Sequence, residues 1–494
     1  MEWRWALEVS RASLASGSAG LAPVGLSMVL PTGSMVWFEH PTQGYVPARV
    51  TQPGTKQITV AVDGTAEKHT MKITGGVAEI GRVFAESLEP QPDMLVFQAP
   101  LGPAVLHNLR LAHRAGLWFT SVGAVLVACW PGGPSPDCGP RALWQHSACR
   151  LSEHSAPQAP HIYELAARAH RSMMRDGLDQ AIVLSGDSGS GKSQLGRLSM
   201  QLLLEIRTLG GTAPSMPTPA ALRQLHAARL LDAFGTAETV HNRSASRFVK
   251  RTALHFDRRS GACMGGEIQT FQLELSRVAG PCAGGEVGRF REERNYHIFF
   301  QMCAGAQPGL RDRHDVLASS DYMLTARSPY AVTEQQTEDR IDAREWAETQ
   351  AAIVGLGISE EDTESLLGAL SAILRLGNLD FALAGEGSVG PDSMRLVDGQ
   401  YGQNLEDSGP DTAAIAARLL GISRAELEKA LCYASVEAGR ERAELSLSES
   451  ECSDRRAMLV TQLYARVFNW LQMNINQAIA STGDVRAVSI FDLP

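Results

Sequence analysis

A glycine-rich octapeptide constrains the fold of this chain more than any other feature. Residues 186–193 read Gly-Asp-Ser-Gly-Ser-Gly-Lys-Ser and match the phosphate-binding pattern G-x-x-x-x-G-K-[ST] in full. The apolar run at 181–184 before it is typical of a buried strand. After it, leucine and isoleucine recur at three- and four-residue steps between Leu195 and Leu209, which marks one face of a helix. Strand, loop and helix in this order predict a nucleotide site, and both flanks disfavour the alternative of a chance Gly/Ser loop.

Each part of the octapeptide has an expected role in holding a nucleotide and Mg²⁺. Glycines let the backbone wrap closely around a polyphosphate and aim its N–H groups inward. The Lys192 side chain is expected to reach the β- and γ-phosphates as a catalytic cation, and the Ser193 hydroxyl to bind Mg²⁺. The predicted nucleotide-binding residues of this loop are Gly186, Asp187, Ser188, Gly189, Ser190, Gly191, Lys192 and Ser193.

Bulk composition narrows the function classes. A net charge of −9 disfavours general nucleic-acid binding. No apolar run is long enough to cross a bilayer, so no transmembrane segment is predicted. The 8 cysteines contain no C-x-x-C spacing, which favours reduced thiols over zinc ligands or disulfides. At 494 residues the chain is too long for one core, and we expect several subdomains.

The chain divides into three predicted parts. Residues 1–34 are predicted to be a disordered extension, because charged residues break their apolar stretches. Residues 35–88 carry short β-type runs separated by turn residues and predict a small antiparallel β-barrel. Residues 89–494 follow a mixed α/β pattern. The predicted fold class is therefore α/β with a small N-terminal barrel.

Within the α/β part, loops and helices alternate. Helices are predicted at 412–420, 423–431 and 456–480, the last from a long amphipathic pattern. Glycine-, proline- or charge-rich stretches predict loops at 208–220, 385–409 and 437–456. The histidines at 161 and 297 lie beside apolar residues, and we interpret them as core histidines without a catalytic role.

The last residues add a further expectation. A β-type run at 488–491 is followed only by Asp492-Leu493-Pro494. We interpret the sequence as a fragment, whose sheet would lack neighbours supplied later in a longer chain. Exposed strand edges invite aggregation. Residues 1–494 expressed alone are therefore expected to be poorly soluble.

Several further stretches share one family resemblance. Residues 242–250 read Asn-Arg-Ser-Ala-Ser-Arg-Phe-Val-Lys, and residues 230–237 read Leu-Leu-Asp-Ala-Phe-Gly-Thr-Ala. The first resembles the switch loop Asn-x-Asn-Ser-Ser-Arg-Phe-Gly-Lys of myosin motor heads, and the second resembles the helix end that precedes it. Similar matches to that family occur at 103–109, 160–163, 294–301, 373–381 and 467–471. The resemblance is collinear from about residue 37 to residue 494.

This resemblance implies a P-loop NTPase core, with a mixed central sheet flanked by helices, that binds ATP and Mg²⁺. It implies that Ser193 and Ser246 are the hydroxyl ligands of Mg²⁺, and that Asn242 touches the phosphates. Asp492 would hold a Mg²⁺-bound water. Arg247, a further catalytic residue, would pair with a second-switch glutamate lying beyond residue 494. The implied partners are actin filaments and, on a neck outside these residues, light chains. The implied location is the cytoplasmic cytoskeleton.

Departures from the family pattern leave the activity open. Ala245 replaces a serine that helps relay a proton, and Val249 replaces a glycine in a loop that bends. Trp130 stands in the region that contacts adenine, where it could stack on a base. Pro494 would stiffen the second switch. The leading hypothesis is an ATP-hydrolysing, actin-based motor head.

Two other functions stay open at this point. The first is a hydrolysis-poor tether that binds nucleotide and filaments without cycling, and the departures motivate it. The second is an unrelated P-loop kinase or GTPase, although the base-reading motifs of GTPases are not visible in the sequence.

Overall fold

The computed structural model describes most of the chain. The described residues are 29–65, 67–73, 81–97, 102–131, 138–139, 141–143, 159–206, 218–240, 242–279, 293–325, 335–384, 393–399, 411–438 and 441–493. The chain forms two compact units, Met1–Ala167 and Arg168–Pro494. Among the helices in these described ranges, none has both the length and the apolar character that crossing a bilayer requires. Residues 1–28 of the predicted extension and 208–217 of the first predicted loop lie outside the described residues.

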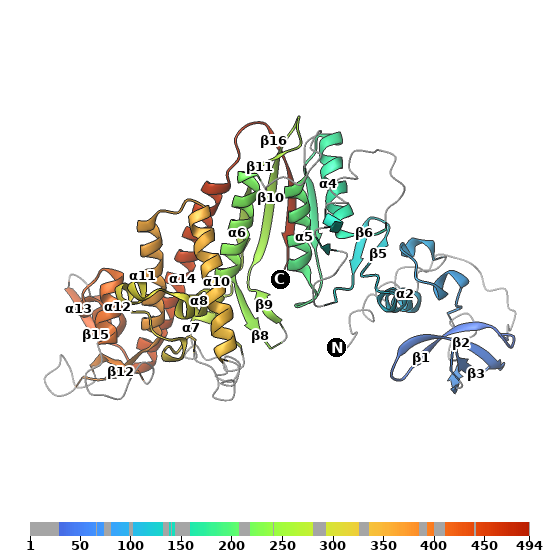
Figure 1. The fold of residues 1–494 in the computed structure, drawn as a ribbon. Helices are drawn as coiled ribbons and strands as arrows, with labels where there is room; N and C mark the ends of the chain where they lie inside the picture. The colour runs from blue at the N-terminus through green and yellow to red at the C-terminus, as the bar shows by residue number, and fades with distance from the viewer. Residues whose placement is uncertain are drawn as a thin grey trace. The chain divides into compact units, whose positions relative to one another are not determined.

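The first unit contains a four-stranded antiparallel sheet, which confirms the antiparallel β structure predicted near the N-terminus (Figure 1). Its strands pair in chain order: β1 (Met35–His40), β2 (Gly44–Gln52), β3 (Gln57–Val62) and β4 (Lys68–Lys72). Alternate residues of β3 are buried, as expected for a sheet with one face against a core. Leu30 is 1% exposed and belongs to that core, although it falls within residues 1–34, which we expected to be a disordered extension.

This sheet is strongly curled. Although β1 and β4 are the outermost strands of the order, the Phe38 ring of β1 stacks on the His69 ring of β4 with a centroid distance of 4.9 Å. Arg82 forms an isolated bridge with Val36 on the free side of β1. The curl agrees with the predicted barrel, whose closure stays a prediction.

The rest of the first unit is mixed. It contains η2 (Ala85–Leu88), η3 (Met94–Val96), α2 (Gly102–Arg114) and the hairpin of β5 (Phe119–Val122) and β6 (Val125–Ala128). Helix α4 (Ile162–Asp176) runs across the boundary between the two units. His161, just before this helix, is 9% exposed, which agrees with its interpretation as a core histidine.

A mixed four-stranded sheet lies at the centre of the second unit, as the resemblance implied. Its strands are β7 (Gln180–Leu184), β10 (Val249–Asp257), β11 (Cys263–Phe271) and β16 (Val485–Asp492). The order is β11-β10-β16-β7, with β16 parallel to β7 and antiparallel to β10. Strand β16 therefore has partners on both sides, and Figure 1 shows it among strands from much earlier in the chain.

Helices flank this sheet. Helix α5 (Lys192–Glu205) lies against β7 and β16, because a Cβ added at Gly196 would lie 3.1 Å from Leu184 and 3.8 Å from Ile490. Helix α6 (Pro219–Gly235) and the long α14 (Glu449–Ile479) contact β11. The Asn476 side chain of α14 both accepts from the backbone N–H and donates to the carbonyl of Ile268 in β11. That pairing covers a strand edge that would otherwise be open.

The remaining elements of the second unit surround its main apolar core. In chain order they are β8 (Thr236–Thr239), β9 (Asn242–Ser246), α7 (Ser276–Ala279), α8 (His297–Gly305), α9 (Pro308–His314), η7 (Ser319–Asp321), α10 (Gln335–Gly355), α11 (Glu360–Gly377), β12 (Leu379–Leu383), β13 (Met394–Asp398), α12 (Thr412–Leu420), α13 (Arg424–Cys432), β14 (Tyr433–Ala438) and β15 (Glu441–Ser446). Tyr464 of α14 is fully buried in this core, and its hydroxyl donates to the carbonyl of Phe234 at 2.6 Å.

Two predicted loops are wrong in part. The stretch at 437–456 was predicted to be a loop, but it contains the end of the β14–β15 hairpin and the start of α14. The helix begins early because Ser448 and Glu451 form a capping box, which satisfies backbone N–H groups of the first turn. The predicted loop at 385–409 contains β13, which pairs with β12, and its other residues, 385–392 and 400–409, lie outside the described ones.

The structure agrees with the interpretation of His297 as a core residue. It begins helix α8 and is 8% exposed. Burial, together with the nearby positive charges of Arg294 and Arg243, lowers its pKa to about 4. The imidazole is therefore neutral at physiological pH, as expected for a histidine that packs in a core.

Candidate functional site

The glycine-rich loop connects β7 to α5, so the predicted strand–loop–helix unit is confirmed. Gly191 ends the loop with a φ of +96°, a left-handed conformation that residues with a Cβ rarely adopt. A Cβ added at Gly186 would lie 2.8 Å from the Ser190 hydroxyl. The loop turns back on itself through a hydrogen bond from the Ser190 N–H to the Asp187 carbonyl. Glycine is therefore required where the loop is tightest.

The start of α5 offers a site for an anion. Gly191 is the N-cap residue and, because it has no side chain, it accepts no capping hydrogen bond from the first turn of the helix. The first N–H groups of a helix lack partners within it, and the helix dipole adds partial positive charge there. A phosphate at the loop would accept hydrogen bonds from these N–H groups and would be attracted by the partial positive charge of the helix dipole.

Lys192 is held against the loop. Its Nζ donates to the carbonyl oxygens of Gly186 at 2.7 Å and Asp187 at 2.8 Å, and the residue is 9% exposed. Burial lowers the pKa of this ammonium group, while the negative charges of Asp492 and Asp187 oppose that shift. The cation thus lies in a partly desolvated position where it attracts anions more strongly than at an open surface.

Two serine hydroxyls from distant segments meet beside the loop. Ser193 follows Lys192 in the first turn of α5, and Ser246 ends β9. Their Oγ atoms are 3.1 Å apart. The structure therefore brings together the two residues that the resemblance assigned to Mg²⁺.

Asp492 reaches the same place from the end of the described chain. It pairs with Leu184, the last residue of β7, because β16 and β7 run parallel. The residue is 6% exposed, and its Oδ1 atom has no hydrogen-bond partner among the described residues. A buried carboxylate oxygen without a partner is costly unless a cation or a water satisfies it.

These groups fit a magnesium ion. Mg²⁺ prefers oxygen ligands in an octahedron at about 2.0–2.1 Å, which places adjacent ligands about 2.9 Å apart. The two serine hydroxyls at 3.1 Å match that spacing, and the unpartnered carboxylate oxygen of Asp492 supplies negative charge nearby. The donor set contains oxygen atoms only, as a hard cation requires.

The segment that carries Ser246 is fixed by the end of α6. The carbonyl of Gly235 accepts a hydrogen bond from the Arg247 N–H at 2.9 Å. A Cβ added at Gly235 would clash with the Phe248 ring, so only glycine fits there. At the other end of β9, Asn242 lies beside the glycine-rich loop, since its Cβ would be 3.9 Å from a Cβ added at Gly189. The hydrogen bond between Arg247 and Gly235 thus fixes the segment just after β9, where it leaves the site.

Arg247 has a partner that the sequence did not reveal. Its Nη1 atom lies 3.3 Å from Oε2 of Glu274, which also accepts from Nε of Arg277 at 3.1 Å. Glu274 follows β11 and a left-handed residue, Gln272, with a φ of +55°. The expected partner was a glutamate beyond residue 494, whereas the described structure contains one within the chain.

Comparisons with known proteins decide the family. The sequence model of the myosin head (motor domain) matches residues 91–493. The chain belongs to the myosin head family. It is 30% identical over 442 residues to Myosin-3 of Arabidopsis thaliana, covering 87% of this chain and 34% of that protein. It is 31% identical over 425 residues to Myosin-1 of the same plant, covering 83% and 33%. The chain thus spans about a third of the length of these relatives.

An ion-pair cluster joins three elements of this myosin head next to the site. Asp232 of α6 accepts from Arg197 of α5 at 2.8 Å and lies 3.6 Å from Nζ of Lys250 in β10. Burial raises the pKa of Asp232, but the charges of Lys250 and Arg197 outweigh it and leave the pKa below its ordinary value. In the sequence, Asp232 stands out only as part of the stretch 230–237 that resembles the family. The cluster fixes the helix that carries Ser193 to the sheet that carries Asp492.

The residues that depart from the myosin pattern lie in different parts of the structure. Ala245 is 1% exposed and pairs with Ala237, so a methyl group occupies this position of β9. Val249 begins β10, where an extended backbone suits a β-branched residue. Trp130 belongs to the first unit, and its stacking on a base stays a prediction. Pro494 lies outside the described residues.

Proposed function

We propose that this chain carries the catalytic centre of an actin-based motor that binds and hydrolyses Mg·ATP. The observation that carries the proposal is the meeting of Ser193 and Ser246 hydroxyls, 3.1 Å apart, at a glycine-rich loop. The membership in the myosin head family supports the same activity. The proposed partners are actin filaments and, on a neck outside these residues, light chains. The proposed location is the cytoplasmic cytoskeleton.

Each residue of the site has a proposed role. The backbone N–H groups of residues 186–193 and the first turn of α5 hold the phosphates, and Asn242 contacts them from the facing segment. Lys192 stabilises the charge on the transferred phosphoryl group. Ser193 and Ser246 would hold Mg²⁺, which when bound would neutralise phosphate oxygens, and Asp492 would accept a hydrogen bond from a water bound to it. Arg247 closes the site around the attacking water.

The same contacts link the site to the rest of the head. Ser246 is followed by Arg247 and Phe248 and then by β10, and Lys250 of β10 pairs with Asp492 of β16. A change in the terminal phosphate would therefore act on two neighbouring strands of the central sheet at once. We propose that this coupling links ATP hydrolysis to actin binding. The segment would have two arrangements, and the bound nucleotide would determine which one is more populated.

Single-turnover hydrolysis tests the proposal. Full-length protein is mixed with substoichiometric Mg·ATP, the total product is quantified after acid quenching, and the free phosphate in unquenched samples is followed with and without actin filaments. A motor forms product within seconds, and filaments accelerate the release of phosphate. Binding without product formation over many minutes would contradict hydrolysis and favour the nucleotide-binding tether, which the buried methyl group of Ala245 would then explain.

A further inference from the structure

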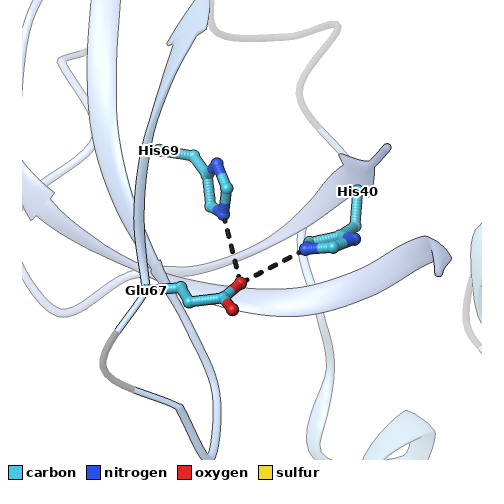
Figure 2. Close-up of side chains that lie close together, drawn as sticks. All are labelled: His40, Glu67 and His69. Atoms are coloured by element: carbon cyan, nitrogen blue, oxygen red, sulfur yellow. Dashed lines mark hydrogen bonds and ion pairs between the residues drawn. The ribbon is translucent and has the colours of Figure 1, made fainter. Parts of the chain in front are cut away.

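Two histidines and a glutamate converge on the N-terminal sheet, far along the chain from the nucleotide loop. His40 ends β1, Glu67 directly precedes β4, and His69 lies within β4. Figure 2 shows both imidazole rings turned toward the Glu67 carboxylate. The Nε2 atoms of His40 and His69 lie 3.3 Å and 3.5 Å from the same carboxylate oxygen. One ligand atom from each residue lies within 4.8 Å of the other two.

These separations match a tetrahedral metal site. At zinc–ligand distances of about 2.0–2.1 Å, neighbouring ligand atoms of a tetrahedron lie about 3.3 Å apart. The two histidine–glutamate separations of 3.3 Å and 3.5 Å already have this value. The two imidazole nitrogens are at most 4.8 Å apart. Zn²⁺ binding would draw the two nitrogens to about 3.3 Å, and a water would supply the fourth ligand beside Glu67, whose side chain is 59% exposed.

Packing orients the two imidazole rings. The Phe38 ring stacks on His69 at 4.9 Å and meets His40 edge-on at 6.2 Å. The Nε2 atom of His69 is buried, and its 3.5 Å contact with Oε2 of Glu67 is an ion pair at the outer limit of hydrogen bonding. The Glu67 side chain is 59% exposed, whereas that of His40 is 10% exposed. Packing against Phe38 therefore orients both rings, and both Nε2 atoms face the Glu67 carboxylate.

The contacts of His40 show what zinc binding has to change. Its Nδ1 atom lies 3.2 Å from the Thr42 hydroxyl and accepts from the backbone N–H groups of Thr42 and Gln43 at 3.3 Å. In the metal-free protein the ring proton therefore lies on Nε2, where it faces the Glu67 carboxylate. Coordination through Nε2 would displace this proton, and a proton on Nδ1 would have to turn away from the two backbone N–H groups and donate a hydrogen bond to the Thr42 hydroxyl.

We propose that His40, Glu67 and His69 bind one Zn²⁺ ion, which joins the end of β1 to β4. Two imidazole nitrogens and one carboxylate form a donor set that zinc accepts, whereas Mg²⁺ and Ca²⁺ prefer oxygen atoms alone. Because β1 and β4 are the outermost strands of the sheet order, the ion connects them across the curl. Zinc binding therefore stabilises the first unit in proportion to its affinity.

The test is a Zn²⁺ titration of the 494-residue chain without nucleotide, followed by calorimetry or chelator competition. Wild type binds one more equivalent of tightly held zinc than Glu67→Gln or His69→Gln, in which the affinity of this site falls at least about 10- to 100-fold. Glu67→Gln keeps a hydrogen-bond acceptor for His40 on an exposed side chain, so its fold and near-ultraviolet circular dichroism stay unchanged. The matched control is His113→Gln, an exposed histidine of α2.

Cobalt substitution and heat stability supply independent readouts. Co²⁺ added to wild type gives the intense visible absorption of tetrahedral coordination, which is absent from Glu67→Gln. Zinc raises the melting temperature of wild type and of His113→Gln, but not of Glu67→Gln. Equal zinc stoichiometry in wild type and Glu67→Gln, or the absence of any tight binding, would overturn the proposal. Neither result depends on nucleotide hydrolysis, so this test stands apart from that of the motor activity.

Discussion

Lys192→Ala is expected to lower the single-turnover rate of ATP hydrolysis by about 10²- to 10³-fold, the usual loss when one preorganised charge on a reacting group is removed. The ammonium group lies 2.7 Å and 2.8 Å from two carbonyl oxygens of the loop, and so its position is fixed before a nucleotide arrives. The change also removes both hydrogen bonds, which stabilise the loop by about 1–3 kcal/mol in total. Quench-flow measurement of product at saturating protein concentration gives the rate.

Lys429→Ala is the matched control for this loss. Its side chain is 62% exposed and pairs with Glu444 of the β14–β15 hairpin, away from the glycine-rich loop. The same change in length and charge should leave hydrolysis unaltered. If Lys192→Ala hydrolysed ATP as fast as Lys429→Ala and melted at the same temperature, the assignment of Lys192 as the catalytic cation would be wrong.

Asp492→Asn should weaken the dependence of ATP binding on Mg²⁺. The carboxylate is buried, one of its oxygens lacks a partner, and the proposed role is to hold a Mg²⁺-bound water. Loss of such an outer partner typically costs 10- to 100-fold in metal affinity. Asparagine has nearly the same shape and removes a buried charge, so we expect the free energy of unfolding without nucleotide to change by only about 1 kcal/mol. A Mg²⁺ titration at fixed ATP measures the effect.

Asp484→Asn provides the comparison, because this residue precedes the same strand but is 71% exposed in a surface pair with Arg258. Its Mg²⁺ titration should overlay that of wild type. An unaltered titration for Asp492→Asn would remove this residue from the metal site. A large loss of stability in the nucleotide-free protein would instead assign it a role in holding the sheet together.

The local part of the site could be predicted from the sequence. Strand, glycine-rich loop and helix are neighbours along the chain, and their apolar periodicity and glycine spacing follow from backbone geometry. That Ser246 and Asp492 lie near this loop was predicted only from the family resemblance, because both are distant from it in the sequence. In the structure, the parallel pairing of β16 with β7 places Asp492 beside Leu184.

The contacts that were missed depend on packing at a distance. Arg247 meets Glu274 only because the chain turns after β11, and no spacing rule links an arginine and a glutamate 27 positions apart. Leu30 falls in the stretch that the sequence predicts to be a disordered extension, yet the curl of the sheet gives its side chain a core in which to pack. The early start of α14 could have been predicted, because Ser448 and Glu451 have the spacing of a capping box. The charged residues around them favoured a loop instead.

We propose that three separated segments converge on one magnesium-bound triphosphate. Isothermal calorimetry of ATP binding to the unmodified chain, once with Mg²⁺ and once with a chelator in its place, tests this convergence. We expect one ATP per chain, bound more tightly with Mg²⁺ than without it. No binding, or equal affinity in the two buffers, would contradict the convergence of Ser193, Ser246 and Asp492 on a metal.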